Sequence, residues 1–142
     1  MTGVREPLAL VEILAALPVT IERAQVHVRT VALRDYGGDG RPSSTVTLGG
    51  ADREGQGEHV GWTREVHEQF AASVRLRSWT WRGTVAQYLV QMDLFEPPDA
   101  PPYGRAAVES ALLDLALKQA GTNLAAVAGA APGPHPMRYV IS

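Results

Sequence analysis

Hydrophobic and polar residues alternate in the first half of the chain, which is the pattern of strands with one buried face. Ala24, Val26 and Val28 alternate with arginine, glutamine and histidine. A short β-branched stretch follows, and then a weaker one that contains two glycines. Three short strands joined by turn-rich segments predict an antiparallel meander. The strands are predicted at residues 19–33, 44–48 and 56–62, and the turns at residues 35–43 and 49–55.

The periodicity then changes from two to about 3.6 residues, which indicates helices. Val66, Phe70 and Val74 are four residues apart, and Thr63 stands where a helix N-cap is expected. His67 falls on the side of this helix that we expect to be exposed, between two glutamates. Strands followed by helices are typical of the α+β class. Helices are predicted at residues 7–17, 64–76, from residue 83 or 84, at 104–121 and at 124–128.

The helix at residues 104–121 is apolar around much of its circumference. Val108 and Leu112 belong to one apolar stripe, and Leu113 and Leu117 belong to a second. A helix that is apolar on more than one side is expected to be buried on more than one side. The sequence therefore predicts a larger body packed around this helix.

The composition narrows the possible functions. With 142 residues, of which 45% are hydrophobic, the chain can form one domain with a core. The net charge of −2 provides no basic surface for nucleic acid, and the lack of cysteine excludes disulfides and a cysteine nucleophile. No apolar run approaches the roughly 20 residues of a membrane span, and the N-terminus does not read as a signal peptide. We therefore expect a cytoplasmic protein with neither nucleic-acid nor membrane partners.

Two motifs carry a resemblance to a known family. Residues 107–121 read Ala-x-x-x-Ala-Leu-x-Asp-Leu-Ala-x-x-x-x-Gly, and residues 55–58 read Gly-x-Gly-Glu at the end of the predicted meander. Together with the order of strands and helices over residues 19–142, they resemble the N-terminal capping domain of the enolase superfamily. The branch that they resemble most is that of mandelate racemase and muconate lactonizing enzyme.

The resemblance implies a three-stranded meander followed by a helical subdomain, with a (β/α)-barrel domain or chain as its partner. In this family the barrel binds Mg²⁺ and a base removes the proton α to the carboxylate of a small substrate. Racemase, epimerase, cycloisomerase and dehydratase activities all remain open, and a homo-oligomer is expected. The expected domains are an N-terminal helical extension (1–18), the capping domain (19–129), and a linker with a possible first barrel strand (130–142).

The residues that do this chemistry in the family are missing from the sequence. The Lys-x-Lys base motif does not occur, and the only lysine, Lys118, reads as a surface residue. The four histidines have no common spacing that would suggest a metal site. We therefore expect no catalytic residue, metal ligand or cofactor in this chain, and we expect the capping domain to be inert alone.

In the family, loops of the capping domain close over the barrel and select the substrate. By position, these loops correspond here to residues 34–43 and 58–63. The residues expected to contact substrate are Tyr36, Arg41, His59 and Trp62. The alternative for Arg41 is a solvated loop charge, for His59 an ordinary strand-end histidine, and for Trp62 packing against a helix or a domain interface.

Two other functions stay open on the sequence. The chain can be a stand-alone binding or assembly module that uses the apolar surface a barrel would cover. It can also be one part of a split enzyme whose barrel is a separate chain.

Overall fold

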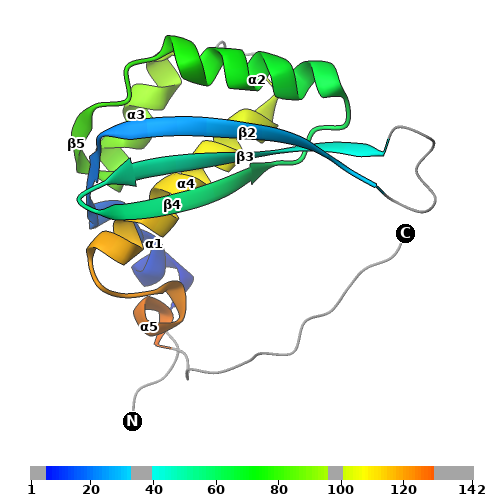
Figure 1. Cartoon of the computed structure of the whole chain (residues 1–142). Helices are drawn as coiled ribbons and strands as arrows, with labels where there is room; N and C mark the ends of the chain where they lie inside the picture. The colour runs from blue at the N-terminus through cyan, green and yellow to red at the C-terminus, as the bar shows by residue number, and fades with distance from the viewer. Residues whose placement is uncertain (1–5, 33–39, 96–100, 130–142) are drawn as a thin grey trace.

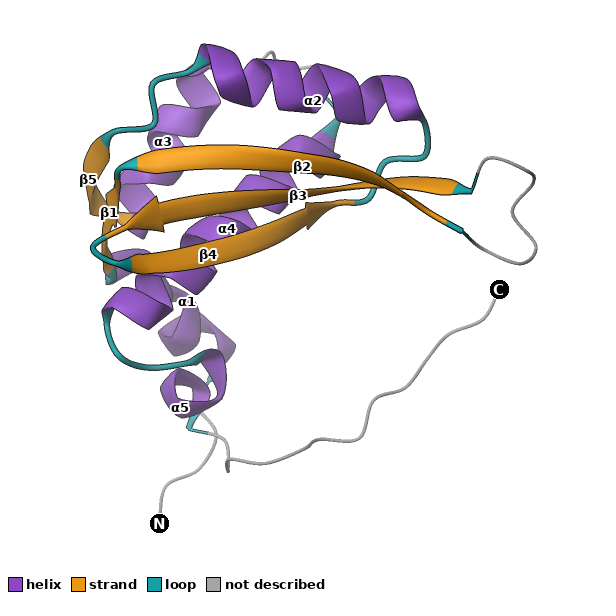
Figure 2. Ribbon diagram, in the orientation of Figure 1, coloured by secondary structure: helices purple, strands orange, loops and turns teal. Residues whose placement is uncertain are grey.

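The computed structural model describes residues 6–32, 40–95 and 101–129, which form an α+β fold. Helices pack on a three-stranded antiparallel sheet, as the sequence predicts, and no strands close into a barrel within these residues (Figures 1 and 2). Along the chain the elements are α1 (Pro7–Ala16), β1 (Pro18–Ile21), β2 (Arg23–Val31), β3 (Arg41–Gly50), β4 (Arg53–His59), α2 (Arg64–Leu76), β5 (Trp81–Thr84), α3 (Val85–Phe95), α4 (Pro102–Gln119) and α5 (Leu124–Ala128).

The predicted meander is confirmed as the sheet β2-β3-β4, with each strand antiparallel to the next. The first predicted strand differs, because it divides at Glu22 into β1 and β2. β1 leaves the meander and pairs with β5, so that Val19 lies opposite Gly83. Pairing with a segment more than 60 residues later therefore sets this division, and no local pattern marks it.

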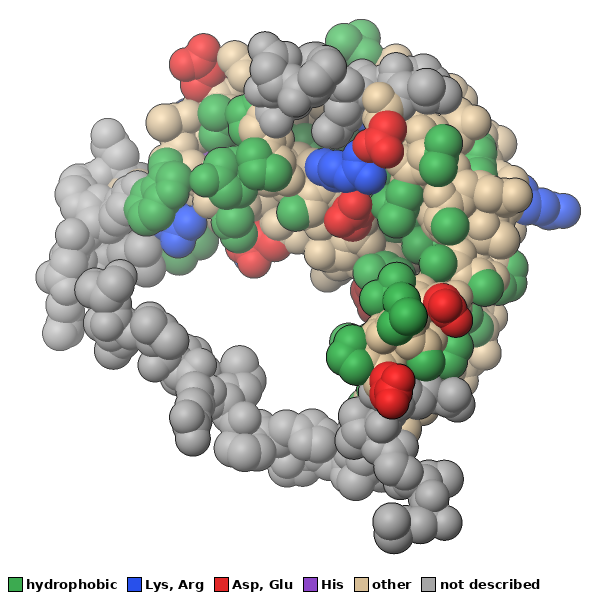
Figure 3. Space-filling view, turned by 180° about the vertical axis from the view of Figure 1, so that it is seen from behind, with side chains coloured by type: hydrophobic (Ala, Val, Ile, Leu, Met, Phe, Trp, Pro, Cys, Tyr) green, Lys and Arg blue, Asp and Glu red, His purple; other side chains and the backbone are tan. Residues whose placement is uncertain are grey.

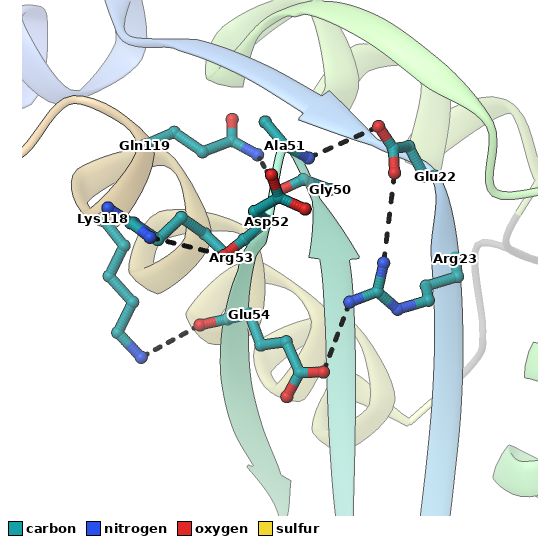
Figure 4. Close-up of polar contacts among 9 residues, drawn as sticks. All are labelled: Glu22, Arg23, Gly50, Ala51, Asp52, Arg53, Glu54, Lys118 and Gln119. Atoms are coloured by element: carbon teal, nitrogen blue, oxygen red, sulfur yellow. Dashed lines mark hydrogen bonds and ion pairs between the residues drawn. The ribbon is translucent and has the colours of Figure 1, made fainter.

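The hairpin between β3 and β4 is tighter than the sequence predicts. Its turn is Ala51-Asp52, and both residues have positive φ angles, of 48° and 59°. Two neighbouring side chains hold this turn in place. The Glu22 carboxylate accepts a hydrogen bond from the Ala51 N–H at 3.4 Å, and the Gln119 amide donates to the Gly50 carbonyl at 3.0 Å (Figure 4). Positive φ is unfavourable for alanine, so this turn stores backbone strain.

One face of the sheet is covered by helices and the other is polar. α4 lies against β4 and β3, and α2 lies against β2 (Figure 1). The core between them includes fully buried Val46 and Leu48 of β3, with Leu112 and Leu115 of α4. The opposite side of the sheet carries polar residues, among them Arg23 and Glu54, which form an ion pair at 3.3 Å.

Two glycines of β4 let α4 approach the sheet closely. A Cβ atom on Gly57 would lie within 3.0 Å of backbone atoms of Ala107 and Ala111, and one on Gly55 would meet the backbone of Ala111 and Leu115 in the same way. The glycines that weaken β4 as an isolated strand are therefore required by the packing of helix on sheet.

The predicted helices are confirmed, with small differences at their ends. Thr63 caps α2, since its Oγ1 accepts from the Val66 N–H at 3.3 Å, and Asn123 caps α5 in the same manner. α4 begins at Pro102, two residues before the prediction, and Gly121 follows it with a φ of 70°. Across the three described ranges, no helix is both long and apolar enough to cross a membrane.

Candidate functional site

Three of the four predicted substrate-contacting residues lie at one end of the sheet. Arg41 begins β3 and His59 ends β4, and antiparallel pairing brings these two ends together. The Arg41 guanidinium carbon lies 4.7 Å from the centroid of the Trp62 ring, and its Nη2 donates to the Val60 carbonyl at 3.1 Å. The structure thus joins Arg41 and Trp62 in a cation–π pair. Tyr36 lies outside the described residues.

A hollow of about 240 Å³ opens beside this pair, and we call it the strand-end hollow. Its polar lining combines the cation of Arg41 with the carboxylate of Glu58 and the hydroxyl of Ser43. Ser43 Oγ donates to Glu58 Oε1 at 2.6 Å, which ties these two side chains together. Arg41 is the cation of the lining and the group that can pair with an anionic ligand, next to the carboxylate of Glu58. The residues around the hollow are Val31, Arg41, Pro42, Ser43, Glu58, His59 and Val60.

His59 lies on the inner side of the hollow and is only 4% exposed. Its ring centroid is 4.6 Å from that of His67 and 4.9 Å from that of Phe70. Burial, and then the neighbouring His67, lower the pKa of His59 from 6.5 to about 4. The ring is neutral near pH 7, and its Nδ1 accepts a hydrogen bond from the Gly61 N–H at 3.1 Å. His59 thus fixes the shape of the segment after β4.

The prediction that His67 is exposed is wrong, because its side chain is fully buried on the inner face of α2. Its Nε2 lies 2.9 Å from the Gly61 carbonyl, and its Nδ1 lies 2.6 Å from Ser44 Oγ. A carbonyl can only accept, so Nε2 carries the proton and Nδ1 accepts from the Ser44 hydroxyl. The sequence signal that was missed is the spacing of His67 with Phe70, Ala71 and Val74, which form one buried stripe.

Ser44 Oγ and His67 Nδ1 are as close as a catalytic nucleophile and its base, but a substrate cannot reach the serine. Both side chains are 0% exposed, so a substrate carbonyl has no path to the serine. The pair instead ties β3 to α2, and through Gly61 it holds the segment that carries Trp62. The residues that shape the strand-end hollow thus rest on a buried hydrogen-bonded layer.

Asp114 of α4 links this helix to the edge of the sheet. Asp114 Oδ2 accepts from the Gln56 N–H at 3.0 Å and from Lys118 Nζ at 3.1 Å. Lys118 also donates to the Glu54 carbonyl at 2.9 Å (Figure 4). Within the described part of the chain, no three histidine, aspartate or glutamate side chains are grouped so that they could hold a metal ion.

Comparison with known proteins gives one match. Residues 12–127 match the model of the N-terminal domain of a domain of unknown function, DUF8230. No curated protein matches the chain, and no solved structure matches it. Because the matched residues cover well over half of the sequence, the chain belongs to the DUF8230 N-terminal domain family.

Proposed function

We propose that this domain is the substrate-specificity cap of an enzyme of the enolase-superfamily type. Its partner would be a (β/α)-barrel, in the same polypeptide or as a separate chain, that performs Mg²⁺-dependent proton abstraction α to a carboxylate. The fold supports this proposal, since a three-stranded meander followed by helices is the arrangement that the sequence resemblance implies. The described residues offer no metal-binding group, so the metal would be held by the barrel.

The observation that carries the proposal is the meeting of the two expected specificity segments at one end of the sheet. Arg41 comes from the first segment and Trp62 from the second, and they stack beside the strand-end hollow. Trp62 is 60% exposed, so its ring is available to contact a ligand or a second domain. Arg41 supplies the charge that a substrate carboxylate would need.

The roles proposed for these side chains follow from their chemistry. The Arg41 guanidinium donates hydrogen bonds to the substrate, and Trp62 holds the guanidinium in place by stacking while excluding water from above. His59, neutral and buried, positions the backbone between β4 and α2 and transfers no proton. This chain therefore binds and orients, and the proton transfer belongs to the barrel.

The test is substrate selectivity in the natural protein together with its barrel. Arg41→Gln should lower kcat/KM for the preferred carboxylate by about 10- to 100-fold, the scale of one charge-assisted hydrogen bond. Mg²⁺ affinity should not change. Arg53→Gln is the matched control, because Arg53 is an exposed arginine of β4 at the opposite end of the sheet. Equal kcat/KM values for the two variants would contradict the proposal.

The proposal extends to location and assembly. Besides having no helix fit to cross a membrane in its described part, the chain has a net charge of −2, which does not favour nucleic acid or anionic lipid. From the sequence resemblance we also propose a cytoplasmic enzyme that forms a homo-oligomer and acts on a small carboxylate.

A specific surface feature favours the second candidate, an assembly module. A hollow of about 200 Å³ between α1, α3 and α4 is lined by Val11, Leu14, Leu89 and Leu113 among others. Leu8 and Val11 of α1 are 70% and 59% exposed, and hydrophobic side chains gather at the α1–α5 end of the molecule (Figure 3). Light scattering after size exclusion tests this function: association that Val11→Glu abolishes would support it, and a monomer at all concentrations would contradict it.

A further inference from the structure

The strand-end hollow carries two opposite charges. Among the described residues that line it, the charged side chains are the Arg41 guanidinium and the Glu58 carboxylate. The volume of about 240 Å³ is below the range of about 300–1,000 Å³ that is typical of drug-sized ligands. A molecule that fills this hollow must therefore be small, and a small molecule there lies close to both charges.

Glu58 has one carboxylate oxygen that a ligand can use. Its side chain lies on the solvent side of β4, since the residues before and after it are buried and Glu58 is exposed. Oε1 accepts from the Ser43 hydroxyl at 2.6 Å, and Ser43 is itself only 7% exposed. No described residue forms a hydrogen bond or ion pair with Oε2. Ser43 thus orients the carboxylate, and Oε2 can accept from a bound cation.

The two charges of the hollow do not neutralise each other by direct contact. Arg41 donates to the Val60 carbonyl at 3.1 Å and lies over the Trp62 ring at 4.7 Å, whereas Glu58 is bonded to Ser43. No ion pair joins Arg41 to Glu58. A guanidinium has five N–H donors, so one bond to a carbonyl leaves others for an anion. The hollow therefore offers both a cation and an anion to the same ligand.

Two valines add apolar surface beside the charges. Val31 of β2 lies opposite Arg41 in the sheet, and both Val31 and Val60 line the hollow. Their side chains are 40% and 48% exposed, so a short aliphatic group could cover them and remove apolar surface from water.

This combination selects against ligands with a single charge. A simple carboxylate would pair with Arg41 but would lie near the like charge of Glu58. A simple ammonium would pair with Glu58 but would lie near Arg41. A zwitterion pairs each of its charges with the opposite one, and specificity of this kind comes from the repulsion of the alternatives as well as from the attraction.

We propose that the strand-end hollow binds a small zwitterion, an α-amino acid with a short aliphatic side chain. Arg41 binds the carboxylate, Glu58 binds the ammonium group, and Val31 and Val60 contact the side chain. The proposal rests on the proposed function in one respect, the binding of the substrate carboxylate by Arg41. It adds Glu58 as the residue that determines specificity.

The test is an NMR titration of the ¹⁵N-labelled chain at neutral pH with three matched probes. Valine carries both charges, isovalerate is valine without the amino group, and isobutylammonium is valine without the carboxylate. With valine, the backbone amide signals of Ser43 and Val60 should shift and saturate, with a dissociation constant on the order of 1–10 mM. Each of the other probes should bind about fivefold more weakly, the scale of one ion pair at an exposed site.

Variants then assign the ammonium site. Glu58→Gln keeps an oxygen that can accept from Ser43 but removes the charge, so it should bind valine no better than isovalerate. Glu54→Gln is the matched control, because Glu54 is an exposed glutamate of the same strand that does not line the hollow and pairs with Arg23. This variant should prefer valine as the wild-type chain does.

The outcomes separate this proposal from the proposed function. Equal affinities of the wild-type chain for valine and isovalerate, or a Glu58→Gln variant that still prefers valine, would overturn the ammonium site. If Arg41→Gln weakens the binding of both acids in that case, the role of Arg41 stands and only Glu58 is ruled out. If none of the three probes gives a saturating shift, the ammonium site and the role of Arg41 both fail. Should Glu58→Gln not fold, the three probes on the wild-type chain decide alone.

Discussion

Acidification should destabilise the domain through His59. The His59 side chain is 4% exposed, and its Nδ1 accepts the Gly61 N–H. Protonation would remove that acceptor and place a charge in a buried site beside the His67 ring. The folded state therefore resists a proton that the unfolded chain accepts freely.

The size and sign of the effect follow from the shift in pKa. The pKa of His59 falls from 6.5 in the unfolded chain to about 4 in the folded protein. Between these values the unfolded state binds more protons, so the free energy of unfolding decreases as the pH falls below about 6.5. The loss is complete below about pH 4. At about 1.4 kcal/mol per pH unit, it amounts to about 3 kcal/mol.

Urea unfolding measured from about pH 7.5 to about pH 4 tests this expectation. His59→Asn lacks the titrating ring, and comparing each variant with itself across pH removes any change in stability at neutral pH. The wild-type domain should lose about 3 kcal/mol more than His59→Asn over this range. Equal losses in the two proteins would refute the reasoning and place the acid sensitivity elsewhere.

Three further predictions concern the scaffold. Gly57→Ala should lower the free energy of unfolding by about 3 kcal/mol in urea titration, because the added Cβ meets the α4 backbone. Gly121→Ala has open space around it and should cost only about 1 kcal/mol, because of its positive φ. Gln119→Ala should lower the free energy of unfolding by about 2 kcal/mol, because the Gln119 side-chain amide makes hydrogen bonds with the backbone of Thr20 and Gly50. Thermal unfolding measures this loss, and an unchanged melting temperature would contradict it. Ala51→Gly should stabilise by about 0.5 kcal/mol in chemical denaturation by relieving a φ of 48°, and a loss of stability would count against strain.

The parts of the fold that depend on local signals could be predicted from the sequence. α2 combines a regular apolar spacing with a threonine cap, and both features act within one or two turns of the helix. The division of the first strand at Glu22 could not be predicted in this way. It depends on the pairing of β1 with β5, whose residues are distant in the sequence.

The candidate site likewise contains residues that the sequence could identify and one that it could not. Arg41, His59 and Trp62 could be chosen because they stand where the family resemblance places the specificity loops. The burial of His67 could not, since a histidine between two glutamates reads as a surface residue until Ser44 and Gly61 are seen to satisfy both ring nitrogens.

The proposed cap is tested most directly by ¹H NMR of α-proton exchange in D₂O with Mg²⁺ and a panel of small carboxylates. Residues 1–142 alone should exchange no α-proton. The domain together with the proposed barrel partner should exchange the α-proton of at least one acid, and Arg41→Gln should slow that exchange by about 10- to 100-fold. Exchange catalysed by residues 1–142 alone, or exchange by the domain and its proposed partner that Arg41→Gln leaves unchanged, would contradict the account.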